Sequence, residues 1–325
     1  MSNSSNLCLC VTCGTQYDIP FDDKPATCRM CNVSNPLLQY ANNHANLVQE
    51  PRQFVPPSGQ SWTTLEKLQA THKNQFKQDD KDSRIWSIFS TPQVAIGQRA
   101  IFIQTEAGNV LWDCISLLDQ ETIDFINSRG GLAAIAISHP HFYSTHLEWA
   151  REFDCPVYLA HEDQEWLNRE DTEGRRIFVE GETKTILPGV NLVKLGGHFP
   201  GSSVLHWNDK IFTGDTIGIS LVSLSTTIEL LATSNIATQS GLNRSHHNKD
   251  HQVFFFHYAF PNFIPLGPTA MHLMWKRLRV WDFTSLYSLF FTTTVHEPNV
   301  KRLVLESMKR QALHQENEGH PLLQE

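Results

Sequence analysis

Residues 132–149 read LAAIAISHPHFYSTHLEW, so a short apolar run leads directly into three histidines, His139, His141 and His146. The run predicts a buried β-strand, because a strand covered on both faces is apolar at every position. In layered α/β folds, ligands gather beyond the carboxyl ends of strands. Two imidazoles at i and i+2 beyond a strand can point at one metal ion. The stretch therefore indicates half of a metal pocket at the edge of a sheet.

Two later stretches add candidate ligands to this pair. His198 lies in the glycine-rich run GGHFPG of residues 196–201, and Asp215 follows the apolar run IFTG of residues 211–214. Alone, His198 is explained as a loop residue and Asp215 as the N-cap of a helix. Taken with the first pair, they favour one metal ion bound by four side chains, His139, His141, His198 and Asp215.

Strand and helix patterns interleave along the same part of the chain. Alternating side chains over residues 99–104 and 109–112 predict a hairpin. Helical patterns cover residues 119–128 and 144–153, and further strands are predicted at residues 156–160, 190–195, 203–207 and 210–213. This interleaving is typical of a mixed α/β fold built in layers.

A second metal site is predicted near the N-terminus. The spacing C-x2-C…C-x2-C, with 14 residues between the pairs, is formed by Cys10, Cys13, Cys28 and Cys31. Two such turns complete a tetrahedral zinc site with four sulfur ligands, and the metal supplies folding energy that so small a segment lacks. The alternative is a set of free or redox-active thiols. Cys8 is left out as the spare cysteine, and a site closed by four sulfurs is not expected to catalyse a reaction.

The order of these motifs resembles the metallo-β-lactamase superfamily. The likeness is carried by GNVLWD at residues 108–113, the H-x-H of residues 139–141, His198, and TGDT at residues 213–216. More narrowly, the chain is similar to a group of that superfamily with an N-terminal zinc ribbon. The resemblance implies an α/β fold, a four-layered αββα sandwich preceded by the small ribbon. It also implies a hydrolase whose metal-bound hydroxide attacks an ester, thioester, lactone or similar bond, with Asp215 and Asp113 as catalytic residues that orient the water or the histidines.

The sequence departs from the H-x-H-x-D-H signature of the superfamily at two positions. Tyr143 and Ser144 stand where the signature has Asp and His, and neither is a good zinc ligand. His146 is kept as a candidate ligand that replaces them if the loop bends differently, against the alternative of a histidine on a helix surface. The late histidine of the superfamily has no convincing counterpart among His257, His272 and His296.

The chain divides into four predicted parts. The atypical insertion at residues 219–252, within the third part, is explained as a lid, a disordered loop or an artefact of the gene model. The parts are a zinc ribbon (1–34), a linker and packing segment (35–80), a metallo-β-lactamase-like domain (81–312, with the atypical insertion 219–252) and a frayed tail (313–325).

Composition limits the possible functions. The 325 residues are 40% apolar and 18% charged with a net charge of -8, which suits a globular protein and disfavours binding to nucleic acid. Neither a secretory signal nor an apolar run long enough for a membrane is found, so a cytoplasmic location is expected. We expect a small-molecule substrate, and the oligomeric state is not indicated. Zinc is expected in both sites, with iron or manganese as alternatives in the main one. A non-catalytic metal-binding scaffold and a nuclease that processes nucleic acid are the alternative functions.

Overall fold

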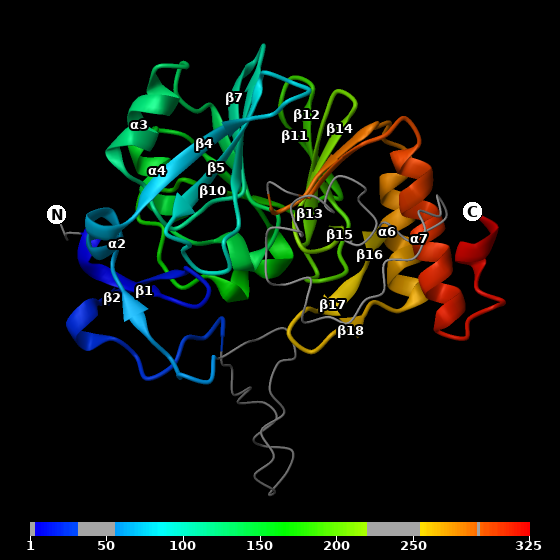
Figure 1. The fold of residues 1–325 in the computed structure, drawn as a ribbon, viewed down its shortest axis with the longest axis horizontal. Coiled ribbons are helices and arrows are strands. Elements are labelled where there is room, and N and C mark those ends of the chain that lie inside the picture. Colours follow the sequence, from blue (N-terminus) through cyan, green and yellow to red (C-terminus); the bar gives the residue numbers. More distant parts are fainter. Residues whose placement is uncertain (1–3, 32–55, 220–253, 291–292) are drawn as a thin grey trace, which may run out of the picture.

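The computed structural model describes residues 4–31, 56–219, 254–290 and 293–325. Two large β-sheets pack face to face, and helices cover the outer face of each (Figure 1). This is the four-layered αββα sandwich that the sequence predicts. The predicted insertion at residues 219–252 lies, apart from Ile219, outside the described residues. None of the helices in the described ranges has the length and apolar character needed to cross a bilayer.

The first large sheet has seven strands in the order β10-β9-β8-β7-β6-β5-β4. Strands β7 to β10 run parallel, whereas β6 and β7 form the predicted antiparallel hairpin, with Ile101 opposite Trp112. Helices α3 (Gln120–Asn127) and α4 (His146–Glu152) connect the parallel strands. The strands are β4 (Lys73–Gln78), β5 (Ile85–Thr91), β6 (Ala100–Thr105), β7 (Gly108–Trp112), β8 (Ala134–Ala136), β9 (Val157–Ala160) and β10 (Arg176–Val179).

The second large sheet has six strands in the order β11-β12-β13-β14-β19-β20. Helices α6 (Pro268–Leu278) and α7 (Val300–His314) cover its outer face through an apolar cluster of their own. The strands are β11 (Thr183–Leu187), β12 (Val190–Lys194), β13 (Ser203–Trp207), β14 (Lys210–Thr213), β19 (Ser285–Tyr287) and β20 (Thr294–His296).

The core between the sheets follows from the alternation of side chains along each strand. Ile101 and Trp112 point toward the second sheet and contact the same apolar cluster as Phe212. Their neighbours Phe102 and Leu111 point the other way, into the cluster that the helices of the first sheet cover. Every residue of β8 and β14 is buried, so the ends of these two strands, which carry predicted ligands, are held by packed layers.

A small three-stranded sheet precedes the sandwich, in the order β2-β1-β3. It is formed by β1 (Leu7–Cys10), β2 (Gln16–Pro20) and β3 (Trp62–Thr63), with the single-turn helices η1 (Ser4–Asn6) and η2 (Phe21–Asp23). The remaining short elements are α2 (Leu65–Thr71), η3 (Pro140–Phe142), η4 (His161–Trp166), β15 (Gly218–Ile219), β16 (Phe254–Phe255), β17 (His257–Ala259), β18 (Ile264–Pro265) and η6 (Pro321–Gln324).

Two of the predicted parts contain elements that the sequence did not indicate. Within the expected linker 35–80, β3 completes the ribbon sheet and β4 is the edge strand of the seven-stranded sheet. The tail 313–325 is not frayed in the structure, because Leu322 is fully buried against α6 and α7. The side chain of Glu325 also contacts Arg279 at 2.7 Å and His272 at 2.9 Å.

Candidate metal centre

The four predicted ligands of the sandwich meet in one place, and we call them the histidine cluster. They come from three strand ends that belong to both large sheets: β8 precedes two of them, β12 and β14 one each. Their ligand atoms all lie within 4.8 Å of one another. The cluster consists of His139, His141, His198 and Asp215.

The spacing of the donor atoms fits one tetrahedral ion. Oδ2 of Asp215 lies 3.0 Å from Nε2 of His139 and 3.4 Å from Nδ1 of His141. Nε2 of His198 lies 3.3 Å from Nδ1 of His141. Four ligands about 2.0 Å from a zinc ion are about 3.3 Å apart at the corners of a tetrahedron. The three nitrogens and the oxygen are therefore arranged as one ligand set.

Gly214 allows this convergence. A Cβ atom at that position would lie 2.4 Å from Oγ of Ser138 and 2.9 Å from Nδ1 of His139. Any larger residue would push the end of β14 away from the end of β8, and Asp215 would move out of reach of the imidazoles. The glycine of the TGDT motif is thus explained by close packing between the two sheets.

Buried hydrogen bonds hold the imidazoles in the tautomer that binds metal. Ser138 donates to both oxygens of Asp113, from its backbone N–H at 2.7 Å and from its hydroxyl at 3.0 Å. Because that hydroxyl proton is engaged, Nδ1 of His139, at 2.8 Å, must donate to the same hydroxyl oxygen, which leaves Nε2 free for a metal. Nδ1 of His198 donates in the same way to the carbonyl of Tyr258 at 2.7 Å.

Asp113, predicted as a catalytic residue that orients the water or the histidines, lies beside Ser138, through which it can position His139. It follows β7 with a positive φ of 60° and contacts Ser138, whereas it is not a member of the histidine cluster. Burial raises the pKa of its carboxyl group well above the ordinary value, although both bonds from Ser138 favour the ionised form. A divalent cation at the histidine cluster would lower that pKa again.

Charges in the cluster also suit a metal. Burial pushes the pKa of Asp215 upward, but the neighbouring His139 and His141 outweigh it and hold that pKa well below its ordinary value. Burial lowers the pKa of His198 well below its ordinary value, so its imidazole is neutral near pH 7. An ionised carboxylate and a neutral imidazole are the forms that bind zinc.

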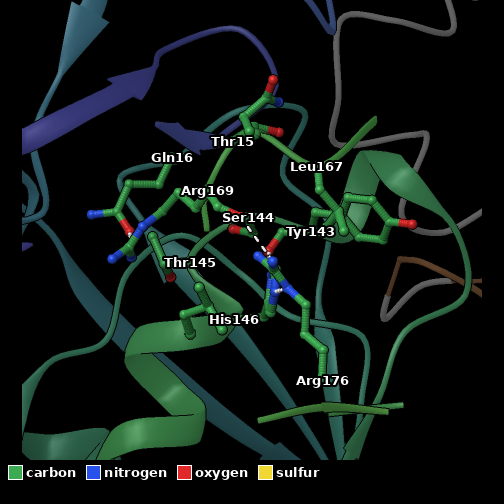
Figure 2. Close-up of a pocket in the computed structure, with 11 residues that line it drawn as sticks. Thr15, Gln16, Tyr143, Ser144, Thr145, His146, Leu167, Arg169 and Arg176 are labelled. Carbon is green, nitrogen blue, oxygen red and sulfur yellow. Dashed lines mark hydrogen bonds between the residues drawn. The ribbon is translucent and has the colours of Figure 1, made fainter. Parts of the chain in front are cut away.

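The prediction that His146 replaces the missing ligands is wrong in this structure. Its Nδ1 lies 2.5 Å from the carbonyl of Tyr143, and its Nε2 accepts a hydrogen bond from Nε of Arg176 at 2.9 Å, so both nitrogens are engaged (Figure 2). Burial, together with the charge of Arg176, lowers the pKa of His146 to about 3. The candidates for a late ligand also lie elsewhere: His272 pairs with Glu325, and neither His257 nor His296 belongs to a cluster of described ligands.

Of the two positions that depart from the superfamily signature, Ser144 binds the ribbon to the sandwich, whereas the hydroxyl of Tyr143 donates to the carbonyl of Asp163. The backbone carbonyl of Ser144 accepts a hydrogen bond from the N–H of Gln16 at 3.2 Å. Oγ of Ser116 donates to the carbonyl of Gly14 at 3.0 Å and lies 3.1 Å from Oγ of Ser144. A Cβ atom on Gly14 would lie 2.2 Å from Oγ of Ser116, so the glycine is required by this contact. We call this contact between the ribbon and the sandwich the seam, and Figure 2 shows it. The cavity at the seam, of about 10 Å³, has room for one water molecule and none for a substrate.

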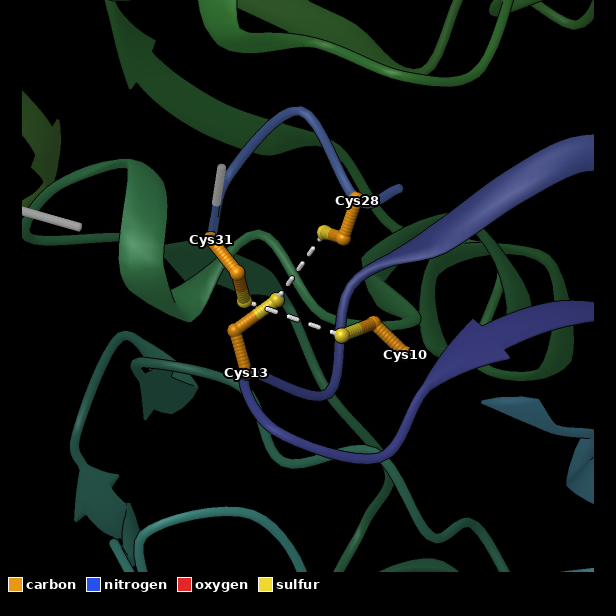
Figure 3. Close-up of side chains that lie close together, drawn as sticks. All are labelled: Cys10, Cys13, Cys28 and Cys31. Atoms are coloured by element: carbon orange, nitrogen blue, oxygen red, sulfur yellow. Dashed lines mark hydrogen bonds between the residues drawn. The ribbon is translucent and has the colours of Figure 1, made fainter. Parts of the chain in front are cut away.

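The second predicted metal site is also assembled, and we call it the cysteine cluster (Figure 3). The sulfurs of Cys10 and Cys31 lie 3.7 Å apart, as do those of Cys13 and Cys28. Four sulfurs about 2.3 Å from a zinc ion are about 3.8 Å apart in a tetrahedron, so the set fits. Cys8 is not part of it, and its thiol donates to the carbonyl of Pro20. The cluster consists of Cys10, Cys13, Cys28 and Cys31.

A cavity of about 190 Å³ lies between the two clusters. His141 and Asp215 line it on one side, and Cys13 and Met30 of the ribbon on the other. The imidazole of His141 is 20% exposed, so the histidine cluster is open toward the cavity. No sequence pattern indicated this contribution of the ribbon, and the only signal for the role of Ser138 was its place directly before His139.

Comparisons with known proteins give one close relative and several distant folds. No family model matches the chain. The uncharacterized protein YmaE of Bacillus subtilis (strain 168) is 34% identical over 311 residues, which cover 94% of each protein. Among solved structures, VMB-1 is 11% identical with a TM-score of 0.49, covering 75% of this chain and 99% of that one. The metallo-β-lactamase FIM-1 from Pseudomonas aeruginosa in its mono-zinc form is 12% identical with a TM-score of 0.44, and the match covers 74% of this chain and 96% of FIM-1. A metallo-β-lactamase from Pontibacter korlensis is 13% identical with a TM-score of 0.46, and the match covers 74% of this chain and 100% of that one. The chain belongs to the same protein family as YmaE.

Proposed function

We propose that the protein is a metal-dependent hydrolase whose active centre is the histidine cluster. One observation carries the proposal: a ligand set with tetrahedral spacing opens onto a cavity through His141 and Asp215. Catalytic metal sites keep access for water and substrate, and zinc accepts a fifth ligand during reaction. When bound, such an ion supplies an activated water at neutral pH and polarises the bond to be broken.

The residues of the chain have distinct roles in this proposal. Asp215 provides the negative charge of the site and an oxygen that can accept the proton of an attacking water at the mouth of the cavity. Asp113 and Ser138 keep Nε2 of His139 unprotonated. The carbonyl of Tyr258 does the same for Nε2 of His198. None of these groups has to move to receive the ion, because the bonds are already in place.

We propose an uncharged ester, thioester or lactone as the bond that is broken. Within the described part of the chain, neither lysine nor arginine lines the cavity, so a phosphoester would find no counter-charge there. The same observation argues against a nuclease. Four cysteines that form no disulfide and are arranged as metal ligands suit a reducing compartment, and on this ground we propose a cytoplasmic location.

A structural metal in the histidine cluster is the second candidate. It is favoured by the carboxylate of Asp215, which occupies the fourth corner of the tetrahedron, because a closed set of four protein ligands is typical of structural zinc. This form of the protein would be a scaffold without turnover.

Metal analysis joined to a substrate screen tests the proposal. We expect two ions per chain by inductively coupled plasma mass spectrometry, identified as zinc or, in the histidine cluster, iron or manganese. His141→Ala is expected to lose one ion and all turnover of 4-nitrophenyl esters, thioesters and lactones. His206→Ala replaces a partly buried histidine of β13 outside both clusters; it is the matched control and should keep both ions and turnover. Two bound ions without turnover of any of these substrates would favour the scaffold.

A further inference from the structure

The cavity between the two clusters has walls from both the ribbon and the sandwich. The ribbon contributes Thr12, Cys13, Met30 and Cys31, the loop between β5 and β6 contributes Ile96 and Gln98, and the other lining residues come from the rest of the sandwich. The ribbon is fixed in this position by the bonds of Gly14 and Gln16 to the sandwich. The space next to the histidine cluster is therefore shaped partly by a domain whose own metal site is closed.

The walls of the cavity are mainly apolar. Met30, Phe142 and Leu289 are buried and line it, and Ile96, which is half exposed, stands at its rim. Asp215 is the one carboxylate among the lining residues that the structure describes. A ligand that fills this space gains from leaving water through its hydrocarbon part, at about fourfold in affinity per methylene.

Gln98 is a polar exception in this wall. Its side chain is only 5% exposed, and its Oε1 has no hydrogen-bond partner among the described residues. A buried amide oxygen without a partner costs free energy that a ligand donor can recover. The oxygen itself is covered, but the side chain lines the cavity, so a turn of the amide toward the cavity brings this oxygen within reach of a donor on a bound molecule.

We propose that this cavity binds the acyl group of the substrate, as a neutral chain or ring of about six to eight carbon atoms that carries one hydroxyl or N–H group toward Gln98. The size follows from the volume of about 190 Å³, since an apolar cavity of about 150 Å³ holds benzene. Met30 makes the ribbon part of the specificity pocket. This inference rests on the proposed function, because it places the acyl side of the scissile bond beside the histidine cluster.

Hydroxamic acids of increasing chain length test the pocket without requiring turnover. They are titrated into the full-length, metal-loaded protein by isothermal titration calorimetry, from acetohydroxamic to decanohydroxamic acid. Affinity is expected to rise about fourfold per methylene up to about six to eight carbons and then to level off. Ile96→Trp narrows the rim, so the affinity should stop rising at shorter chains. Met30→Ala enlarges the cavity, so the affinity should go on rising for about two more carbons.

Val11→Ala is the matched control, because Val11 is an exposed ribbon residue outside the cavity. It should leave the chain-length profile as it is, and a content of two ions per chain confirms that each variant is folded at both clusters. A profile that is flat in the unmodified protein, or that moves equally in Val11→Ala, would overturn the proposal. Chain-length selectivity in binding, with no ester hydrolysed, would leave the pocket standing and refute the hydrolase. Turnover of esters with no chain-length selectivity in binding would support the hydrolase and refute the pocket.

Gln98 is tested with hexanohydroxamic acids that carry one hydroxyl at successive positions. One position is expected to bind about tenfold more tightly than the unsubstituted chain, because it supplies the donor that Oε1 lacks. Gln98→Leu keeps the size and should abolish that preference, with the unsubstituted chain bound at least as well as before. Equal affinities for all positions in the unmodified protein would exclude Gln98 as a ligand contact.

Discussion

The two metal clusters of this chain are built in opposite ways. The cysteine cluster stands on the turns of a small sheet that has few apolar residues of its own, whereas the histidine cluster stands at strand ends fixed by two packed sheets. Two of the cysteines have polar partners, with Gln60 donating to Sγ of Cys10 at 3.2 Å and Oη of Tyr17 3.2 Å from Sγ of Cys28, but a thiolate has no tautomer that a partner must fix. Each of His139 and His198 is first oriented by a partner, Ser138 or the carbonyl of Tyr258.

This difference separates two uses of a metal. In the ribbon, metal binding supplies the free energy that holds the segment in its fold. In the sandwich, packed strands and buried hydrogen bonds hold the ligands, and the cluster would leave a bound ion accessible from the cavity that His141 and Asp215 line. Loss of metal should therefore unfold one region and inactivate the other.

Cys28→Ser should give the largest effect. Loss of one thiolate from a four-sulfur site removes most of a binding free energy of about 10–16 kcal/mol, which is folding free energy for the ribbon. We expect one ion per chain, and amide hydrogen exchange in β1 and β2 should become fast. Cys8→Ser is the control, because Cys8 is a buried cysteine of the same strand as Cys10 but not a ligand. Protected amides in the Cys28→Ser ribbon would show that packing against the sandwich suffices to fold it.

His198→Ala should give the next largest effect, on activity and not on fold. Loss of the ion from the sandwich should lower kcat/KM by about a thousandfold or more, equivalent to about 4 kcal/mol of transition-state stabilisation. The ribbon amides should stay protected, because the two clusters share no ligand. Hydrolysis rates and hydrogen exchange measured on the same sample decide this. Simultaneous loss of both ions would contradict the independence of the two regions.

How far the sequence predicts the molecule also differs between the regions. The cysteine cluster is predictable in full, because two C-x2-C turns define the site without reference to distant residues. The four residues of the histidine cluster and the αββα sandwich are predictable from strand patterns and from the resemblance. The surroundings of His146, the packing of the tail and the wall of the cavity are not predictable from the sequence, because they depend on which distant side chains pack beside them. Arg176, which engages His146, follows it by 30 positions, and Leu322 is buried by helices that local polarity does not reveal.

Asp113→Asn tests whether orientation of the imidazole matters in the histidine cluster alone. The amide nitrogen would donate to Oγ of Ser138, whose hydroxyl would then donate to Nδ1 of His139 and place the proton on Nε2. Metal affinity of this cluster should fall by about 10- to 100-fold, as for other partners of ligating histidines. Competition with a chromophoric chelator measures it. Asp209→Asn is the control for loss of a carboxylate elsewhere, and an unchanged affinity in Asp113→Asn would remove the positioning role.

His146→Gln should give the smallest effect, and it tests whether the third histidine belongs to the metal or to the seam with the ribbon. The pKa of His146 is about 3 in the folded protein and about 6.5 in an unfolded chain. Above pH 6.5 the imidazole is neutral in both states, and stability is at its full value. As the pH falls from 6.5 toward 3, the unfolded state binds the proton first, and stability falls by up to about 1.4 kcal/mol per pH unit.

Glutamine can donate to the carbonyl of Tyr143 and accept from Arg176, as His146 does, but it does not titrate. Between pH 7 and pH 5, the unmodified protein should therefore lose about 2 kcal/mol more of its free energy of unfolding than His146→Gln does. Urea unfolding at a series of pH values measures the two slopes. The difference should persist after a chelator has removed the ion from the histidine cluster, because His146 does not contact it. Parallel slopes would show that the imidazole is solvated, and a difference that disappears with the metal would return His146 to the ligand set.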